Sequence, residues 1–368
     1  MPARKLERFA AESEVGAAQF MGFSDRILGR KNVNGGPHID GVSPAFALTG
    51  GEVRITGSGL RPQELLRPKV RFGNFEAPVV VSSDGFLVTR VPEGAVSGPI
   101  VVATNGHESN PQQIRVAVTI AENLHPVTNP ALDAEGNIYV TFSGSRGQKV
   151  PVSVFKIDTN YGVKPFVSEM MNATSIAFDR QGQMYVSSRF DGAVYKVAPN
   201  GSQSTYSEGL GIATGIAFDR EGSLYVGDRN GTIFKISRDQ QMFVFATLEM
   251  SVSAYHLAFG PRGDLFVTGP NDRVYKVDPS GNVSTFYKGL GRPQGLAFDA
   301  DGNLYVAASL AGTRGIVKIT SEGNASLEVA GQGLVGLAFA PGRSVVLATT
   351  NAVHHLLWNI PGLPLLPE

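Results

Sequence analysis

The sequence predicts an all-β protein in which a β-sandwich precedes a six-bladed β-propeller. Two observations carry this prediction. A motif of short strands and turns recurs about every 40 residues along the C-terminal part of the chain. About seven short strands, separated by Gly, Ser and Pro turns, come before these repeats within roughly 80 residues. The 44 glycines and 22 prolines of the chain agree with many short strands joined by turns.

The repeat unit is clearest at residues 215–228, which read as a strand, a tight turn and a second strand. In its Asp-x-x-Gly turn, Asp219 can accept backbone hydrogen bonds and Gly222 can adopt a positive φ without steric cost. The next residues, 224–226, are Leu-Tyr-Val without alternating polar residues, as expected of a strand buried on both faces. Residues 233–236 then predict a third short strand.

Copies of this unit follow one another at nearly constant spacing. Successive spacings between the residues that precede the turn are 46, 40, 41, 39 and 41, and these residues are Leu132, Phe178, Phe218, Phe259, Phe298 and Phe339. Six copies of a unit with four short strands predict a propeller of six blades, which we assign to residues 120–361.

The sixth copy has no evident fourth strand after residues 353–358. An unpaired edge would leave backbone donors and acceptors without partners, so closure of the ring requires a strand from elsewhere in the chain. The segment 116–121, at the end of the sandwich, is the natural candidate and would fix the two domains together. The Pro-rich tail, residues 362–368, is not expected to add a central strand.

Residues 1–37 match neither pattern and are expected to form an arm that is partly helical or disordered. Leu6, Phe9 and Ala10 have helical spacing, and Ser24 with Asp25 could cap a second short helix. The arm either packs loosely on the propeller or docks on a partner, including a second copy of the chain. No secretory signal or membrane-spanning run is visible, so the expected location is cytoplasmic.

The segment before the repeats carries four short motifs in a defined order. Residues 39–44 read I-D-G-V-S-P and residues 50–60 read G-G-E-V-R-I-T-G-S-G-L, followed by V-R-F-G at 70–73 and V-P-E-G-A-V-S-G at 91–98. In this order the motifs closely resemble the IPT/TIG family of immunoglobulin-like domains, over residues 38–119. The resemblance implies a binding or spacer module without catalytic activity.

The repeats share the pattern G-[IL]-A-F-D-x-x-G-x-L-Y-V followed by [VI]-[YF]-K-[VI]. They resemble the NHL-repeat and regucalcin/gluconolactonase group of six-bladed propellers. This group includes calcium- or zinc-dependent lactonases and related esterases, metal-dependent lyases, and binding proteins. Its lactonases hold their metal with Glu, Asn and Asp at the axial entrances of the innermost strands. The corresponding positions in this chain are Thr128, Thr174, Thr214, Tyr255, Gln294 and Val335.

These entrance positions predict a poor site for a divalent metal ion, because none of them is a carboxylate. We therefore expect no metal cofactor, while calcium or zinc would belong to the lactonase alternative. The lyases of the group would require axial His and Glu, and His256 stands alone near the ring. The segments that begin at Asp133 and Asp299 look like fragments of a calcium loop, but both lack the distant bidentate Glu and fit ordinary turn chemistry.

The loops between the second and third strands are expected on the same face as the axial entrances. Several arginines in these loops could bind an anionic ligand, or they could pair with neighbouring Asp residues in a solvated rim. The sequence leaves both interpretations open. The candidate residues of these loops are Arg146, Arg189, Asp228, Arg229 and Arg314.

Composition excludes several classes of function. The absence of cysteine excludes disulfides, thiolate nucleophiles and Cys-ligated zinc. Equal numbers of basic and acidic residues, 32 of each, argue against a nucleic-acid-binding protein. No Gly-x-Ser-x-Gly nucleophile elbow occurs. The sequence therefore predicts a protein that binds a small anionic molecule or a protein partner, without nucleic acid or membrane. The alternative is a lactonase or esterase of the gluconolactonase type, whose catalytic residues the sequence does not identify.

Overall fold

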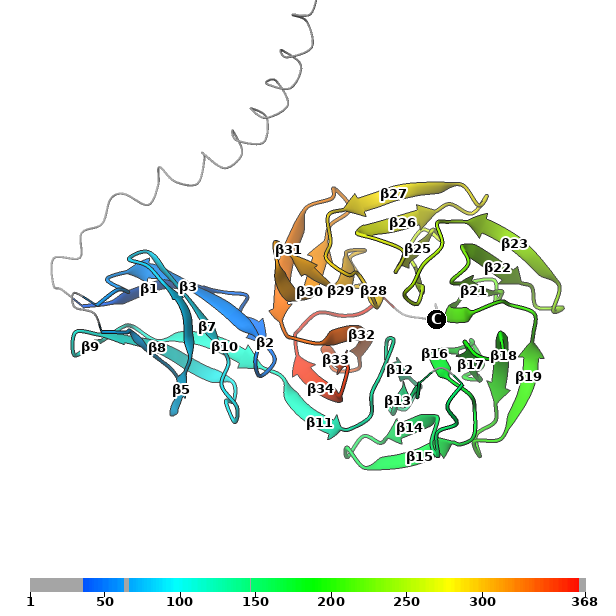
Figure 1. The fold of residues 1–368 in the computed structure, drawn as a ribbon, viewed down its shortest axis with the longest axis horizontal. Helices are drawn as coiled ribbons and strands as arrows, with labels where there is room; N and C mark the ends of the chain where they lie inside the picture. The colour runs from blue at the N-terminus through cyan, green and yellow to red at the C-terminus, as the bar shows by residue number, and fades with distance from the viewer. Residues whose placement is uncertain (1–35, 63–65, 146, 364–368) are drawn as a thin grey trace, which may run out of the picture.

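The computed structural model describes residues 36–62, 66–145 and 147–363, which form strands and turns without a helix. Figure 1 shows a sandwich of strands beside a ring of small sheets. The all-β prediction is therefore confirmed. Within the described ranges, no helix is long and apolar enough to cross a membrane. The helices expected near the N-terminus fall in residues 1–35, which lie outside the described part of the chain.

Two sheets face each other in the sandwich. The first contains, in order, β1 (His38–Ser43), β3 (Glu52–Ser58), β7 (Phe86–Arg90) and β6 (Val79–Ser82). The second contains β2 (Phe46–Ala47), β10 (Gln112–Val116), β8 (Gly98–Thr104), β4 (Lys69–Phe72) and β5 (Phe75–Ala77), and β9 (His107–Glu108) pairs with β8. Burial alternates along β3, where Val53 and Ile55 are buried and Arg54 is exposed, so one face of each strand builds the core.

Four-stranded antiparallel units form the ring. Five of them are separate sheets. The first contains β12 (Ala131–Leu132), β13 (Ile138–Thr141), β14 (Val154–Ile157) and β15 (Val163–Val167), and the second contains β16 (Ala173–Phe178), β17 (Met184–Ser188), β18 (Ala193–Val197) and β19 (Gln203–Ser207). The third contains β20 (Ala213–Phe218), β21 (Leu224–Asp228), β22 (Thr232–Ile236) and β23 (Met242–Thr247), and the fourth contains β24 (His256–Phe259), β25 (Leu265–Thr268), β26 (Arg273–Val277) and β27 (Val283–Lys288).

Two further units lie next to the sandwich. One contains β28 (Leu296–Phe298), β29 (Leu304–Leu310), β30 (Thr313–Ile319) and β31 (Ala325–Ala330), within a larger ten-stranded sheet. The other contains β32 (Leu334–Ala340), β33 (Ser344–Thr349), β34 (Ala352–Leu357) and β11 (Val118–Glu122). One strand of each unit lies toward the centre of the ring, and the other strands follow outward (Figure 1). The inner strands are β12, β16, β20, β24, β28 and β32. This is the arrangement of a β-propeller.

The Asp-x-x-Gly turn forms as its sequence predicts. The backbone N–H of Ser223 donates to Asp219 Oδ1 at 2.8 Å, and the N–H of Gly222 donates to the Asp219 carbonyl at 3.1 Å. Gly222 has a φ of 84°, a conformation in which a Cβ would be strained. The aspartate of this turn also accepts a hydrogen bond from a tyrosine of the next strand. In the turn at residues 299–302, the Tyr305 hydroxyl donates to Asp299 Oδ2 at 3.1 Å.

Aromatic rings connect each unit with the next one. The Tyr225 ring packs edge-on against Phe259 of the following unit, with ring centroids 4.9 Å apart. The same contact joins Tyr185 to Phe218 at 5.0 Å. The repeated Phe before the turn and Tyr after it are therefore the two halves of one contact between units, which adds to the stabilisation from area burial.

The two faces of the ring carry different connections. We call the face with the Asp-x-x-Gly turns, such as residues 219–222 and 299–302, the turn face. The opposite face carries the connections between second and third strands and those between successive units. We call it the loop face.

Strand β11 closes the ring by pairing antiparallel with β34, from Val118 opposite His355 to Glu122 opposite Ala352. This confirms the expectation that the end of the sandwich supplies the missing strand. The sequence did not predict a second connection, in which the short strand β2 pairs in parallel with both β31 and β10. The sandwich and the ring therefore share a continuous sheet.

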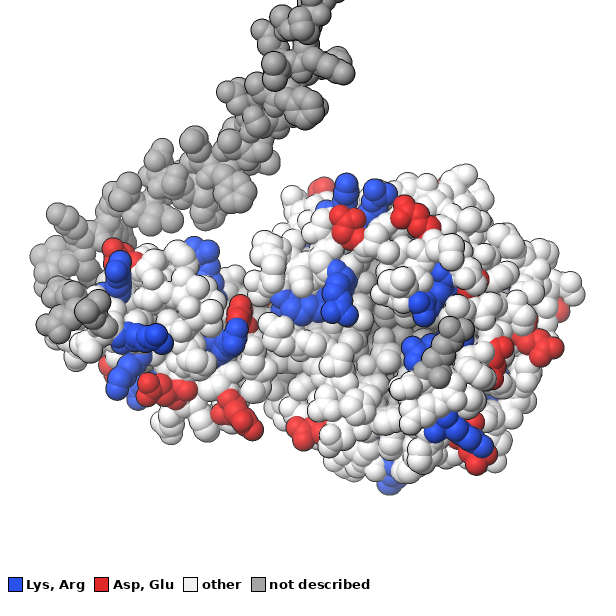
Figure 2. Space-filling view, viewed as in Figure 1, with Lys and Arg blue, Asp and Glu red and all other residues white. Residues whose placement is uncertain are grey.

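Side chains of both charges are interspersed over the face of the molecule in Figure 2. Among the described residues on that face, basic side chains do not gather into one broad stripe of the kind that follows nucleic-acid phosphates. The distribution agrees with the equal totals of 32 basic and 32 acidic residues.

Leu48 tests the junction between the two domains. It follows β2, is 2% exposed, and packs in the same apolar cluster as Trp358, while its N–H donates to the Ala330 carbonyl at 2.8 Å. We expect Leu48→Ala to lower the free energy of unfolding by about 2–5 kcal/mol, because it leaves a cavity at the junction. Urea unfolding followed by the fluorescence of Trp358, the chain's single tryptophan, measures this loss.

The matched control is Leu60→Ala, in the core of the sandwich. Both variants are expected to shift the Trp358 transition if the domains unfold as one unit. If Leu60→Ala does not change the urea midpoint of the Trp358 fluorescence transition, the two domains unfold separately.

Candidate functional site

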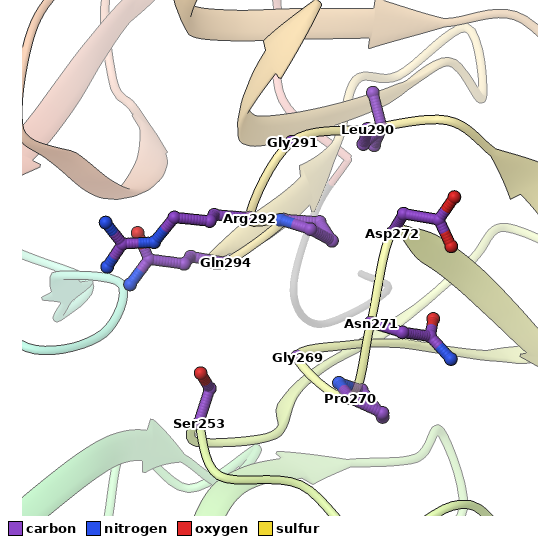
Figure 3. Close-up of a pocket in the computed structure, with 10 residues that line it drawn as sticks. Ser253, Gly269, Pro270, Asn271, Asp272, Leu290, Gly291, Arg292 and Gln294 are labelled. Carbon is purple, nitrogen blue, oxygen red and sulfur yellow. The ribbon is translucent and has the colours of Figure 1, made fainter.

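A pocket of about 350 Å³ opens on the loop face, between the β24–β27 unit and the β28–β31 unit (Figure 3). Its walls are the 269–272 loop, which joins β25 to β26, and the 290–294 connection, which joins β27 to β28. Ser253, from the connection between β23 and β24, completes it. Loops on a rigid scaffold commonly carry binding sites, and this pocket is therefore the candidate functional site.

Arg292 is the basic residue among those that line this pocket. It is exposed, and its guanidinium lies beside the side-chain amide of Gln294 (Figure 3). Within the described part of the chain, no acceptor lies within hydrogen-bond distance of this guanidinium. Asp272 points away from Arg292 in the same view, and its carbonyl accepts the N–H groups of Gly289 and Leu290 at 3.0 Å each. Arg292 therefore keeps its five donors for a ligand.

A second guanidinium, that of Arg314, lies behind the first. Its Nη2 donates to Gln294 Oε1 at 2.5 Å, and its Nη1 donates to the carbonyl of Arg292 at 2.7 Å and to that of Gly291 at 3.3 Å. The Leu334 carbonyl accepts from Arg314 as well. Burial, followed by the nearby charge of Arg292, lowers the pKa of Arg314 to about 10. A partly desolvated positive charge therefore lies next to the lining residues Arg292 and Gln294.

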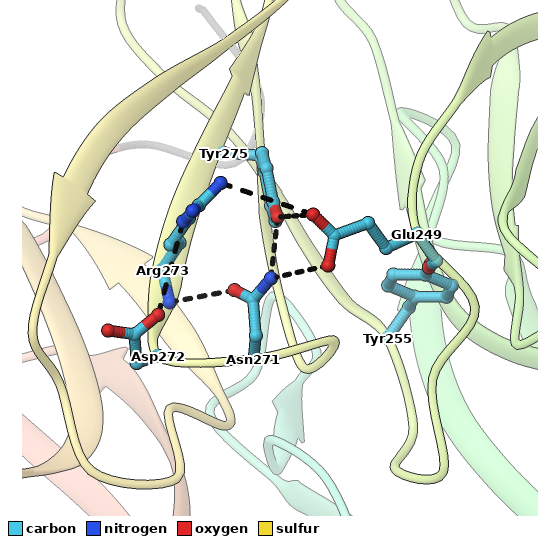
Figure 4. A network of polar contacts seen from close by, with 6 residues as sticks. All are labelled: Glu249, Tyr255, Asn271, Asp272, Arg273 and Tyr275. Carbon is cyan, nitrogen blue, oxygen red and sulfur yellow. Dashed lines mark hydrogen bonds and ion pairs between the residues drawn. The ribbon is translucent and has the colours of Figure 1, made fainter.

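A polar network holds the other wall in place (Figure 4). Asn271 Nδ2 donates to Glu249 Oε2 at 2.9 Å and lies 2.7 Å from the Tyr275 hydroxyl oxygen. Arg273 Nη1 approaches Glu249 Oε1 at 4.0 Å, and the backbone N–H of Arg273 donates to Asn271 Oδ1 at 3.0 Å. The Tyr255 hydroxyl donates to the Glu249 carbonyl, and burial raises the pKa of Tyr255 to about 12. The 269–272 loop is thus fixed before any ligand arrives.

The threonines predicted at the axial entrances hold the inner strands together. Thr128 Oγ1 donates to the carbonyl of Thr174 at 2.7 Å, and Thr214 Oγ1 donates to the carbonyl of Gly227 at 2.9 Å. The Thr174 hydroxyl donates to the Asn172 carbonyl at 2.9 Å. All three threonines are buried. Their hydroxyls are therefore committed to backbone acceptors within the ring.

Most of the predicted loop residues also make contacts within the protein. Arg189 Nη2 donates to the carbonyl of Gly144 at 3.0 Å, and Arg229 Nε donates to that of Ser251 at 3.2 Å. Asp228 is 4% exposed and accepts the N–H of Ile212 at 2.8 Å. Arg146 lies outside the described residues.

Of the predicted site residues, Gln294 and Arg314 come together at the loop-face pocket. The sequence did not point to Arg292 or Ser253, which lie on connections between units. The predicted site residues lie in the loops between second and third strands and at the single entrance position of each unit. Arg292 lies instead on the connection between two units, two residues before the entrance residue Gln294. A search of the whole inter-unit connection for charged residues would have found it.

The described residues do not fit a calcium or zinc site of the kind that the resemblance implies. Among residues 36–62, 66–145 and 147–363, no group of three or more His, Asp or Glu side chains is placed to hold a metal ion. The buried threonine hydroxyls at the axial entrances are already bound to backbone carbonyls. We derive no metal-dependent chemistry from this ring.

His256 lies on the axis side of the ring, at the start of β24, and is 4% exposed. Burial, followed by the nearby charge of Arg314, lowers the pKa of His256 to about 4. The imidazole is therefore neutral at physiological pH. It lines a second cavity, on the turn face.

Comparison with known proteins identifies the first domain and relates the rest of the chain to a known fold. Residues 37–119 match the model of the IPT/TIG domain, so this part of the chain is an IPT/TIG domain. No curated protein matches the chain. The remainder has the β-propeller fold shared by several solved structures.

Three of these structures illustrate the similarity. A structural-genomics protein of unknown function from Bacteroides thetaiotaomicron has a TM-score of 0.55 and 16% identity, covering 89% of this chain and 99% of its own. An auxiliary nutrient binding protein from the same organism has a TM-score of 0.53 and 13% identity, covering 88% and 98%. A gluconolactonase from Xanthomonas campestris has a TM-score of 0.56 and 14% identity, covering 66% and 89%. At these identities the similarity concerns the fold alone.

The buried neutral His256 makes stability depend on pH. Its folded pKa of about 4 lies below the ordinary value of 6.5, so between these values the unfolded chain binds a proton that the folded chain does not. Stability contributed by neutral His256 is therefore fully present above pH 6.5 and is lost as the pH falls toward 4. We expect His256→Gln to remove about 2 kcal/mol of the stability loss between pH 7 and pH 4.5.

Urea unfolding of the wild type and the variant at the two pH values measures this difference. The control is His107→Gln, at an exposed position on β9, which should leave the pH dependence as it is. Equal pH dependence in the wild type and His256→Gln would contradict the assignment.

Proposed function

We propose that the chain is a binding protein that recognises a small anionic molecule in the loop-face pocket. We also propose that its six four-stranded units are the blades of a six-bladed propeller of the NHL type, with residues 120–361 as the propeller domain. In this arrangement the blades position the pocket, and the IPT/TIG domain serves as a rigid attachment at the side of the ring.

The observation that carries the proposal is the pair of adjacent guanidinium groups of Arg292 and Arg314. Arg314 is committed to Gln294 and to carbonyl groups, and its lowered pKa reflects burial and the charge of Arg292. Two neighbouring positive charges repel each other, and an anion between them or beside them offsets that repulsion. Arg292 offers the planar fork of donors that suits a carboxylate.

The other groups in the pocket favour a ligand that carries hydroxyl groups in addition to its charge. Ser253, Asn271 and Gln294 contribute a hydroxyl and two side-chain amides to the lining. The volume of about 350 Å³ is within the range of small-molecule sites. A sugar acid combines a carboxylate with several hydroxyls and meets these requirements. The auxiliary nutrient binding protein with the same fold offers a precedent for a binding role, at the level of the fold alone.

The alternative function is a metal-dependent lactone hydrolase. The gluconolactonase fold of the Xanthomonas campestris protein supports the scaffold of this alternative. The described residues do not supply its metal ligands, because no cluster of three His, Asp or Glu side chains is placed to hold an ion. We therefore favour binding over catalysis.

Substitution of Arg292 tests the proposal. Calorimetric titration with D-gluconate should give one saturable site, and Arg292→Gln should weaken it by about 10- to 100-fold, since a hydrogen bond to a charged group is lost. Neutral D-glucose should bind more weakly than gluconate. The control, Arg180→Gln, changes an exposed arginine in a turn-face turn and should leave the affinity unchanged.

Two results would overturn the binding proposal. One is equal affinity for gluconate in the wild type and in Arg292→Gln. The other is turnover of D-gluconolactone that requires added calcium or zinc, which would establish the hydrolase alternative. A protein partner that binds at the pocket and is not displaced by small anions would also count against the proposed ligand class.

A further inference from the structure

A second cavity of about 570 Å³ follows the axis of the ring and opens on the turn face. We call it the axial chamber. Its mouth lies among turn-face residues that include Asp219, Arg220, Glu221 and Arg262. Asp219 also pairs with Lys235, at 3.5 Å between the carboxylate and the ammonium nitrogen. Charged groups of both signs thus surround the entrance, and the apolar residues lie deeper in the chamber.

The walls of the axial chamber are apolar. Small side chains of the inner strands leave its centre open, and phenylalanines one residue further along reach toward the mouth. These lining residues are Ala177, Ala217, Ala258, Ala297 and Ala338, together with Phe178, Phe218, Phe259, Phe298 and Phe339. The alanines are half-buried although they lie on the innermost strands, because they face the chamber. These side chains provide apolar contact area for a ligand.

Close packing of the inner strands narrows the axis toward the loop face. Gly215 lies so near the next unit that an added Cβ would stand 2.4 Å from the Tyr255 carbonyl oxygen. A Cβ on Gly336 would stand 2.6 Å from Asn129 Cα. Asn129 Nδ2 donates to the carbonyl of Leu296 at 2.8 Å, and its Oδ1 accepts the N–H of Leu337 at 3.1 Å. Asn129 therefore ties three units together at this end of the chamber.

His256 is one of the polar residues of the lining, with Thr128, Asn129 and Ser175. His256 is 4% exposed and lines the chamber. Among the described residues, none forms a hydrogen bond with its ring nitrogens. A polar group of the lining without a protein partner is available to an occupant of the chamber, and an occupant that supplies the hydrogen bond gains affinity from it. Neutral imidazole offers one donor and one acceptor.

We propose that the axial chamber binds an uncharged small molecule with an apolar body and one hydroxyl group, which forms a hydrogen bond with His256. This site lies on the face opposite the loop-face pocket and does not depend on the anionic ligand proposed for that pocket. The apolar body fits the alanine and phenylalanine walls, which offer no partner for a charged group.

A pair of probes that differ in one hydroxyl group tests this site on the full chain. Calorimetric titration with para-cresol should give one saturable site, and toluene should bind about 3- to 10-fold more weakly, as expected for one neutral hydrogen bond. His256→Phe should remove the preference for para-cresol. His355→Phe, on β34 and outside the chamber lining, should keep it.

A second variant tests the cavity itself. Ala338→Phe fills the chamber from a half-buried lining position and should abolish binding of both probes, while gluconate binding at the loop-face pocket is kept. Thermal unfolding of each variant shows whether it is folded. Absence of saturable para-cresol binding, or an equal preference for para-cresol in the wild type and in folded His256→Phe, would overturn the proposal.

The C-terminal segment offers the last discriminating experiment. Leu363 lines the chamber, and its N–H donates to the Phe298 carbonyl at 2.9 Å, so the chain leads to the cavity at this point. Deletion of residues 364–368 should leave para-cresol affinity unchanged. If para-cresol binds only after this deletion, the chain itself is the occupant of the chamber and the proposed free ligand is wrong.

Discussion

The hydrogen bonds between β11 and β34 are the constraint on which the rest of the structure depends. A propeller with an open edge would expose unpaired backbone groups, and the last unit supplies three strands of its own, β32 to β34. The fourth strand, β11, continues directly from the end of the sandwich. Closing the ring and attaching the sandwich are therefore one structural event. Strand β2 then extends the neighbouring unit through β31, so two adjacent units hold the sandwich by backbone pairing.

The fold could be predicted because each repeat encodes its own local structure. Asp219 and Gly222 lie four positions or fewer from the groups they serve, and this turn recurs in several units. The contact of Tyr225 with Phe259 joins units that are neighbours in sequence as well as in space. Closure of the ring by a strand from elsewhere was predictable for a different reason. Unpaired backbone groups at an open sheet edge cost free energy in any propeller. The parallel pairing of β2 escaped prediction because two residues, Phe46 and Ala47, carry too short a pattern to indicate a strand.

The candidate site was harder to predict, because its character depends on which acceptors happen to lie near each donor. Thr128 and Arg229 have side chains suited to ligands, yet both find backbone carbonyls in neighbouring units. The residues next to Arg292 in the sequence form no motif. Arg292 differs from the other arginines discussed because no described residue accepts a hydrogen bond from its guanidinium. Asn129 follows an entrance residue that the sequence did point to, but its bonds to Leu296 and Leu337 span units far apart in the chain.

Arg314 links the two ends of the axis through electrostatics. Its charge contributes to the low pKa of His256, and the charge of Arg292 contributes to the low pKa of Arg314. The inner strands pack closely at Gly215 and Gly336, and the charge of Arg314 acts on His256 across this packed region. An anion held by Arg292 would offset part of the positive field around Arg314. Because that field opposes protonation of His256, the same anion would ease protonation of the imidazole on the far side of the ring.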